Sequence, residues 1–216
     1  MRHTRASMTL MRRNKQLSSP SMTSTDVKGD LHEYFRGARE TLLWKLEGLG
    51  EYDIRRPMTP TGTNLLGLVK HQATTNISYF CKPFGRSHDL SLPWMNGDVE
   101  PGASLWATAD ETRDEIVDLY RQTWEIADAT IAELPLDALG RFPGWGRGTK
   151  LTLQRVLVHV TAEAQRHAGH ADIIRELIDG SAGLLKGHNN LHASDPTERS
   201  RHRDRVEAAA RLASGG

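Results

Sequence analysis

The stretch "VLVHVTAEAQRHAGHADIIREL", residues 156–177, predicts a helix that carries titratable side chains on its apolar face. At 3.6 residues per turn, one face of this helix collects the apolar residues Val156, Val160, Ile174 and Ile178. The same face also collects His159, Glu163, His167 and His170, whereas the other face holds Thr161, Gln165, Asp172 and Glu176. Burial of a carboxylate is costly unless it is paired, protonated or bound to a metal. This stripe therefore indicates either a buried polar cluster or a functional site.

Periodic apolar residues predict four helices between residues 28 and 180. The first spans about 28–49, with Gly50 as its C-terminal cap, and the second runs from about 64 to 82 after Thr63 as its N-terminal cap. "TADE", residues 108–111, has the form of a capping box and predicts the start of a third helix that ends before Pro135. The fourth spans about 152–179.

Two long connections rich in Pro and Gly, residues 83–106 and 136–150, join these helices, and no run of alternating apolar residues predicts a sheet. The sequence therefore predicts an all-α fold, a four-helix bundle with long crossover connections, over residues 28–180. Trp94, Trp106 and Trp145 lie in the connections and could border a cavity, although tryptophans in such places more often have a simple packing role.

The flanking segments look different from this domain. Residues 1–27 lack an apolar period and are expected to form a disordered extension, a targeting peptide or a segment before a later start codon. Residues 181–216 form a polar tail with one short helix expected at about 196–213.

Bulk properties exclude several classes of function. A net charge of +1 gives no support for a nucleic-acid partner, and no apolar run approaches the roughly 20 residues of a membrane span. The single cysteine, Cys81, excludes an internal disulfide and a thiolate-rich zinc cluster. A cytoplasmic protein without a nucleic-acid or membrane partner is expected.

Glu163 and His167 are four residues apart, so their side chains project together from consecutive helical turns. They form half of a metal site if another helix supplies a further ligand, and His71, at the edge of the second helix's apolar stripe, is a candidate. Such ligands suit zinc, nickel or ferrous iron. Two plainer interpretations stay open: core histidines with satisfied ring nitrogens, or a buried Glu163–His167 ion pair. "EAQRH" is not the HExxH motif of metalloproteases.

The strings "WKLEGLGEYDIRRPMTPTGTNLLGLVKH", residues 44–71, and "VLVHVTAEAQRHAGHADIIRELIDG", residues 156–180, resemble the DinB/YfiT-like superfamily. The resemblance is closest to its branch of mini-circle-type proteins and mycothiol-dependent transferases, and it covers about residues 28–180. It implies a DinB-like four-helix bundle, often a homodimer, with a divalent metal on three side chains. Carried over by position, these are His71, Glu163 and His167.

The resemblance also implies a chemistry, because members of the superfamily use the metal to bind a low-molecular-weight thiol and deliver it to an electrophile. Three protein ligands leave an open position for such a molecule. His159 and His170 are then candidates for orienting a ligand or accepting the thiol's proton. The leading hypothesis is a metal-dependent thiol S-transferase acting on small electrophiles. The alternatives are a non-catalytic bundle that binds metal or a small ligand, and a hydrolase that uses metal-bound hydroxide.

Overall fold

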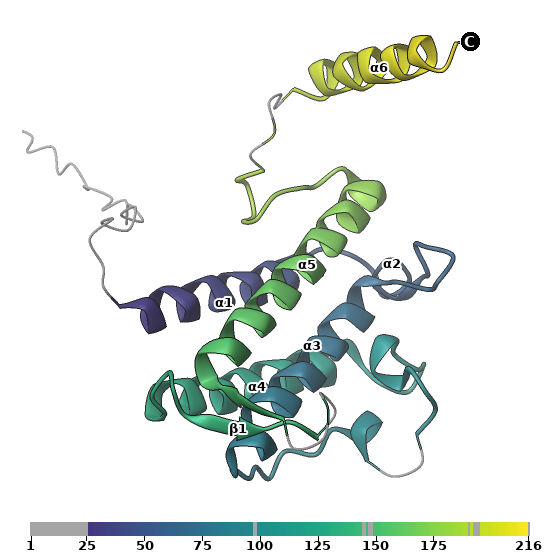
Figure 1. Cartoon of the computed structure of the whole chain (residues 1–216). Helices are drawn as coiled ribbons and strands as arrows, with labels where there is room; N and C mark the ends of the chain where they lie inside the picture. Colours follow the sequence, from purple (N-terminus) through teal and green to yellow (C-terminus); the bar gives the residue numbers. More distant parts are fainter. Residues whose placement is uncertain are drawn as a thin grey trace, which may run out of the picture.

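The computed structural model describes residues 26–96, 99–143, 146, 149–189, 191 and 195–215. The predicted N-terminal extension lies almost entirely outside these residues, and Trp145 lies outside them too. Within the described part, the helices are α1 (Val27–Trp44), α2 (Glu51–Arg55), α3 (Leu65–Phe80), α4 (Arg113–Glu133), α5 (Leu153–Asp179) and α6 (Pro196–Ala213) (Figure 1). The predicted all-α class is confirmed.

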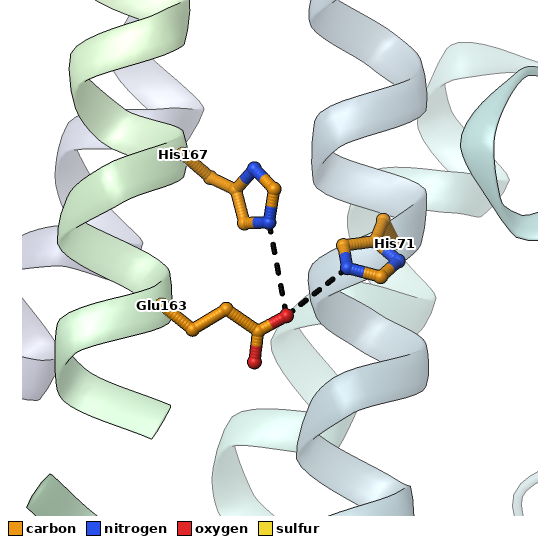
Figure 2. Close-up of side chains that lie close together, drawn as sticks. All are labelled: His71, Glu163 and His167. Carbon is orange, nitrogen blue, oxygen red and sulfur yellow. Dashed lines mark hydrogen bonds and ion pairs between the residues drawn. The ribbon is translucent and has the colours of Figure 1, made fainter. Parts of the chain in front are cut away.

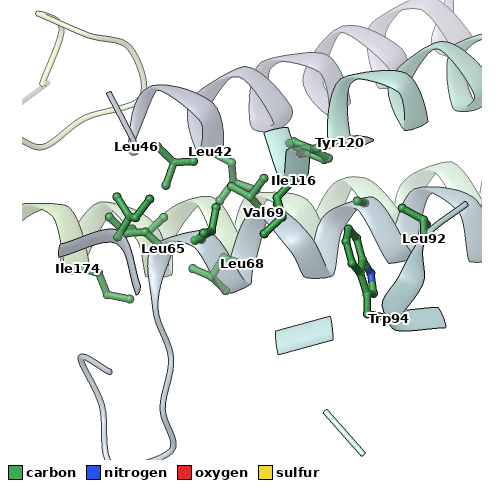
Figure 3. Packing of buried hydrophobic residues seen from close by; sticks show 14 of the residues in the cluster. Leu42, Leu46, Leu65, Leu68, Val69, Leu92, Trp94, Ile116, Tyr120 and Ile174 are labelled. Carbon is green, nitrogen blue, oxygen red and sulfur yellow. The ribbon is translucent and has the colours of Figure 1, made fainter. Parts of the chain in front are cut away.

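The core lies between α1, α3, α4 and α5. α1 packs against α5, and α3 packs against both α4 and α5. Leucines from α1 and α3 meet Ile116 and Tyr120 of α4 and Ile174 of α5 in one cluster of buried residues (Figure 3). A second cluster, around Phe35, Phe80 and Val160, lies toward the other ends of these helices. The arrangement places α3 and α5 side by side, which matters for the histidines that both helices carry.

α5 begins and ends where the sequence predicts. Thr152 caps its N-terminus by accepting a hydrogen bond from the backbone N–H of Arg155, and Gly180 ends it with a φ of 78°. The buried stripe of α5 includes Val156, Val160 and Ile174, together with a run of small residues, Ala164, Ala168 and Ala171.

The three histidines and Glu163 of α5 are not buried in that stripe, contrary to the expectation from the helical wheel. His159, Glu163, His167 and His170 are all half-buried and lie along the edge of the stripe. The reason is that alanine fills the central positions, so the long polar side chains emerge beside the core rather than inside it. Their partial exposure lowers the cost of keeping them charged or polar.

Two predicted helix boundaries are wrong. The first helix ends at Trp44 and not near residue 49, because the chain turns through Gly48 at a φ of 75° and Gly50 becomes the N-cap of the separate helix α2. The third helix begins four residues later than "TADE" predicts, because the capping box is formed by Thr112 and Glu115. Glu111 accepts a hydrogen bond from the N–H of Thr108 and also binds Lys70 of α3, as described below.

The prediction of no sheet is also wrong in one place. Strands β1 (Leu139–Arg141) and β2 (Lys150–Thr152) pair in antiparallel register within the second connection. Strands of three residues are too short for an alternating pattern to stand out in the sequence. The first connection holds three short 3-10 helices, η1 (Lys82–Phe84), η2 (Pro93–Met95) and η3 (Ala103–Leu105).

The C-terminal helix α6 forms at the expected residues, with Asp195 as its N-cap and Pro196 at its first position. No described side chain of α6 is buried. In the part of the chain that the structure describes, no helix is long and apolar enough to cross a membrane.

Candidate metal centre

α3 places His71 two turns after its N-terminus. Asn64, and not Thr63 as predicted, caps the helix by accepting a hydrogen bond from the N–H of Gly67 at 2.8 Å. A Cβ atom on Gly67 would lie 2.0 Å from the carbonyl oxygen of Leu105, so η3 can approach this turn only because residue 67 has no side chain. A close backbone contact between α3 and η3 therefore lies one turn before His71.

His71, Glu163 and His167 come together between α3 and α5 (Figure 2). The Nε2 atom of His71 lies 3.1 Å from Oε1 of Glu163, and the Nε2 atom of His167 lies 3.7 Å from the same oxygen. The two imidazole rings meet edge to face, with centroids 5.0 Å apart. His71 of α3 and His167 of α5 thus each direct a ring nitrogen toward the same carboxylate oxygen of Glu163.

The carboxyl group of Glu163 is held in its charged form. Burial raises its pKa, but interactions with His167 and His71 outweigh burial and lower the pKa to about 2. The side chains of His71, Glu163 and His167 are 25%, 23% and 17% exposed. The group is therefore anionic at neutral pH and still reachable from solvent.

The donor set fits a metal ion. One ligand atom from each of the three residues lies within 4.8 Å of the other two. Bond lengths of about 2.0–2.1 Å to a tetrahedral ion separate neighbouring ligand atoms by about 3.3 Å, which falls between the two distances to Oε1. Glu163 Oε2 and the Nδ1 atoms of both histidines are buried and have no hydrogen-bond partner among the described residues. If the three residues had a purely structural role, these buried polar atoms would normally have hydrogen-bond partners.

His159 and His170, the other two titratable residues of the stripe, lie on either side of this group. The ring of His170 is 5.5 Å from that of His167, and burial, with the charges of His167 and Arg166, lowers the pKa of His170. His159 lies one turn before Glu163, and its Nε2 atom is 3.1 Å from the hydroxyl oxygen of Tyr79. The structure thus brings His170 next to a candidate ligand and joins His159 to the far end of α3.

A buried lysine beside the site was not recognised in the sequence. Lys70 directly precedes His71, is 1% exposed, and donates hydrogen bonds to both carboxylate oxygens of Glu111 at 2.7 Å. Its Nζ atom also lies 4.7 Å from the ring centroid of Trp94, whose Nε1 donates to Thr74. A lysine within the apolar string "LLGLVKH" was the available signal. Through these contacts Lys70 binds the connection after α3 to α3 itself, the helix that carries His71.

The tryptophans of the first connection therefore have different surroundings. Trp94 is a buried core residue, 6% exposed, whereas Trp106 is 45% exposed and donates to Glu100. Cys81, at the C-terminal cap of α3, is buried, and this burial raises the pKa of its thiol.

Comparisons with known proteins identify the family of this chain. No functionally curated protein was found to match the chain. A solved structure described as the conserved protein of locus from Enterococcus faecalis matches with a TM-score of 0.57 and 17% sequence identity, covering 73% of this chain and 100% of that chain. At this identity the likeness shows the fold alone. The family model described as mycothiol-S-transferase matches residues 30–180, which include both helices that meet at the site. The chain belongs to the mycothiol S-transferase family, within the DinB-like proteins.

Proposed function

We propose that this protein is a transferase that uses a divalent metal ion, held by His71, Glu163 and His167, to join a low-molecular-weight thiol to a small electrophile. The observation that supports the proposal most is the convergence of these three side chains from two helices, with ligand atoms within 4.8 Å of one another. The family match makes mycothiol the expected thiol. Zinc, nickel and ferrous iron all suit two imidazoles and a carboxylate.

The protein's part in the chemistry is to hold the ion with an open face. Two neutral imidazoles and one carboxylate neutralise a single charge of a divalent ion, so the site retains a net positive charge that attracts a thiolate. A metal ion bound here supplies a Lewis acid that lowers the pKa of a coordinated thiol. Because all three side chains are partly exposed, a thiol can approach from solvent.

His170 is our candidate for the proton acceptor. Its lowered pKa keeps the ring neutral at pH 7, and its position beside His167 puts it at the edge of the ligand group. The thiol's proton passes to His170, the sulfur forms a bond to the electrophilic carbon, and the leaving group departs with the electron pair of the broken bond. We assign His159 a positioning role, since it joins α5 to Tyr79 of α3.

Two other functions use the same residues. A bundle that binds metal or a small ligand without turnover needs only the ligand group, and a hydrolase needs a water in place of the thiol. The 3.1 Å contact of His71 with Glu163 also favours a plain ion pair in the absence of a metal. The homodimer and the cytoplasmic location stay predictions.

One experiment separates these functions. The purified protein is freed of metal, loaded with zinc, nickel or ferrous iron, and mixed with a chromogenic aryl halide in the presence of mycothiol, bacillithiol or glutathione. Metal- and thiol-dependent release of halide supports the transferase. Hydrolysis without any thiol favours the hydrolase, and metal binding without turnover favours the binding protein. His202→Ala, a change in the exposed helix α6, serves as the histidine control.

A further inference from the structure

A pocket of about 910 Å³ opens at the C-terminal end of α3, away from the three candidate ligands. Its walls come from the last turns of α3, from the segment 81–96 and from the end of β1 with the two residues that follow. Ser78 in this wall lies seven residues after His71, about 10 Å along the helix at 1.5 Å per residue. Neither His71, Glu163 nor His167 lines the pocket. Its volume is typical of small-molecule sites.

Every acidic or basic lining residue with a fixed charge is basic: Lys82, Arg86 and Arg141. Arg86 donates a hydrogen bond of 2.6 Å to Glu133, a residue that does not line the pocket. Among the described residues, Lys82 and Arg141 form no ion pair. Both are exposed, so their charged ends can move to meet a ligand. In a chain with a net charge of only +1, these cations give this opening a locally positive potential.

The floor of the pocket is apolar and aromatic. Ile77, Leu92 and Phe142 line it and are 6%, 2% and 5% exposed. The ring of Phe142 lies 5.9 Å from that of Tyr79, and the Tyr79 hydroxyl is held by His159. Both rings contribute to the apolar wall of the pocket, against which a flat ligand can pack.

One polar atom of the lining lacks a partner. Nδ1 of His88 is buried and has no hydrogen-bond partner among the described residues. A buried nitrogen in that state is normally satisfied by water or by a ligand. The pocket therefore combines an aromatic floor, a free polar atom and a basic rim.

We propose that this pocket binds a small aromatic anion, such as a carboxylate or sulfonate on a planar ring. The ring lies against Phe142 and Tyr79, and the anionic group faces Lys82 and Arg141. Binding requires neither the metal centre nor transfer chemistry.

Titration calorimetry with naphthalene-2-sulfonate tests the proposal, because its neutral relative naphthalene-2-methanol has the same rings without the charge. The full chain is titrated at low ionic strength, once with EDTA and once with zinc. We expect the sulfonate to bind more tightly than the alcohol, with the same Kd in both conditions, and to weaken at 0.5 M salt because salt screens exposed charges. Equal affinity for both compounds, no binding at millimolar concentration, or loss of binding with EDTA would overturn the proposal.

Matched substitutions locate the site. Arg141→Gln and Lys82→Gln should each weaken sulfonate binding by about fivefold, the upper range for an exposed charge pair. Arg121→Gln, on the exposed face of α4, removes the same charge elsewhere and should leave the Kd unchanged. Because all three side chains are exposed, circular dichroism should show the same fold in every variant. Unchanged affinity in both pocket variants contradicts the proposal.

Discussion

Nε2 of His71 and Oε1 of Glu163 lie 3.1 Å apart although 92 residues separate them in the chain. The contact joins α3 to α5, and His167 reaches the same oxygen from one turn farther along α5. An ion pair and a metal centre both explain this arrangement. The two explanations predict different metal affinities for Glu163→Gln, which removes the charge of the carboxylate and keeps its shape.

Glu163→Gln should weaken metal binding at least about tenfold, the lower end of the range for changes that only touch a ligand. His71→Ala and His167→Ala should have effects of the same size or larger, and His170→Ala a smaller one. Competition with a metal-sensitive dye measures the affinities, with His202→Ala as the control. Equal affinities in wild type and Glu163→Gln would leave the ion pair as the explanation.

Glu163 should also make the stability of the metal-free protein depend on pH. Its pKa falls from 4.5 to about 2 on folding, so the folded state favours the charged carboxylate. This stabilisation is complete above pH 4.5 and is lost as the pH falls toward 2. The difference in unfolding free energy between wild type and Glu163→Gln, from urea titrations, should therefore shrink between pH 5 and pH 2.5. A difference that stays constant over this range argues against the interaction.

Sequence periodicity was most informative for α5, where the predicted span of about 152–179 agrees with Leu153–Asp179 and the predicted apolar residues Val156 and Val160 are buried. The spacing of Glu163 and His167 was sufficient to bring them together, because four residues are about one helical turn. His71 is different. Its approach to α5 depends on how two helices pack, so its place at the edge of the apolar stripe of the second helix made it only a candidate, and the family resemblance was needed to select it.

The errors concern features that depend on contacts distant in sequence. "TADE" and "TRDE" are equivalent as capping boxes, and the choice between them depends on the pairing of Glu111 with Lys70. The end of α1 depends on a turn at Gly48, whose positive φ has no counterpart in an apolar pattern. The polar stripe of α5 lies at the core's edge because of the neighbouring alanines, a matter of side-chain volume that a helical wheel does not include.

Alanine substitutions at two helical glycines should change the unfolding free energy in opposite directions. Gly67→Ala places a Cβ 2.0 Å from the Leu105 carbonyl oxygen, and we expect a loss of about 1–3 kcal/mol in unfolding free energy from overpacking. Gly169→Ala, in α5, meets nothing within 4 Å and should add about 0.5–1 kcal/mol, because alanine favours helix. Thermal or urea unfolding measures both. A stabilising Gly67→Ala would show that η3 does not pack as described.

The buried lysine gives a further test of stability. Glu111→Gln leaves Lys70 buried without its carboxylate partner, so we expect a loss of about 2–4 kcal/mol. Glu47→Gln removes a carboxylate from the exposed pair with Lys186 and should change stability by less than about 1 kcal/mol. Urea unfolding compares the two variants. Equal effects would mean that Lys70 is accessible to water.

The pH dependence of transfer tests the role of the metal most directly. A free thiol has a pKa of about 8.5, and coordination should move the apparent value toward about 7. The rate of transfer at saturating thiol should therefore rise through an inflection between about pH 6 and 7. It should fall further on the acid side, because protonated His71 and His167 cannot bind a metal. An inflection near 8.5 that does not change when the metal is removed would mean that the thiol ionises unaided, and that the histidines of α5 have a structural role.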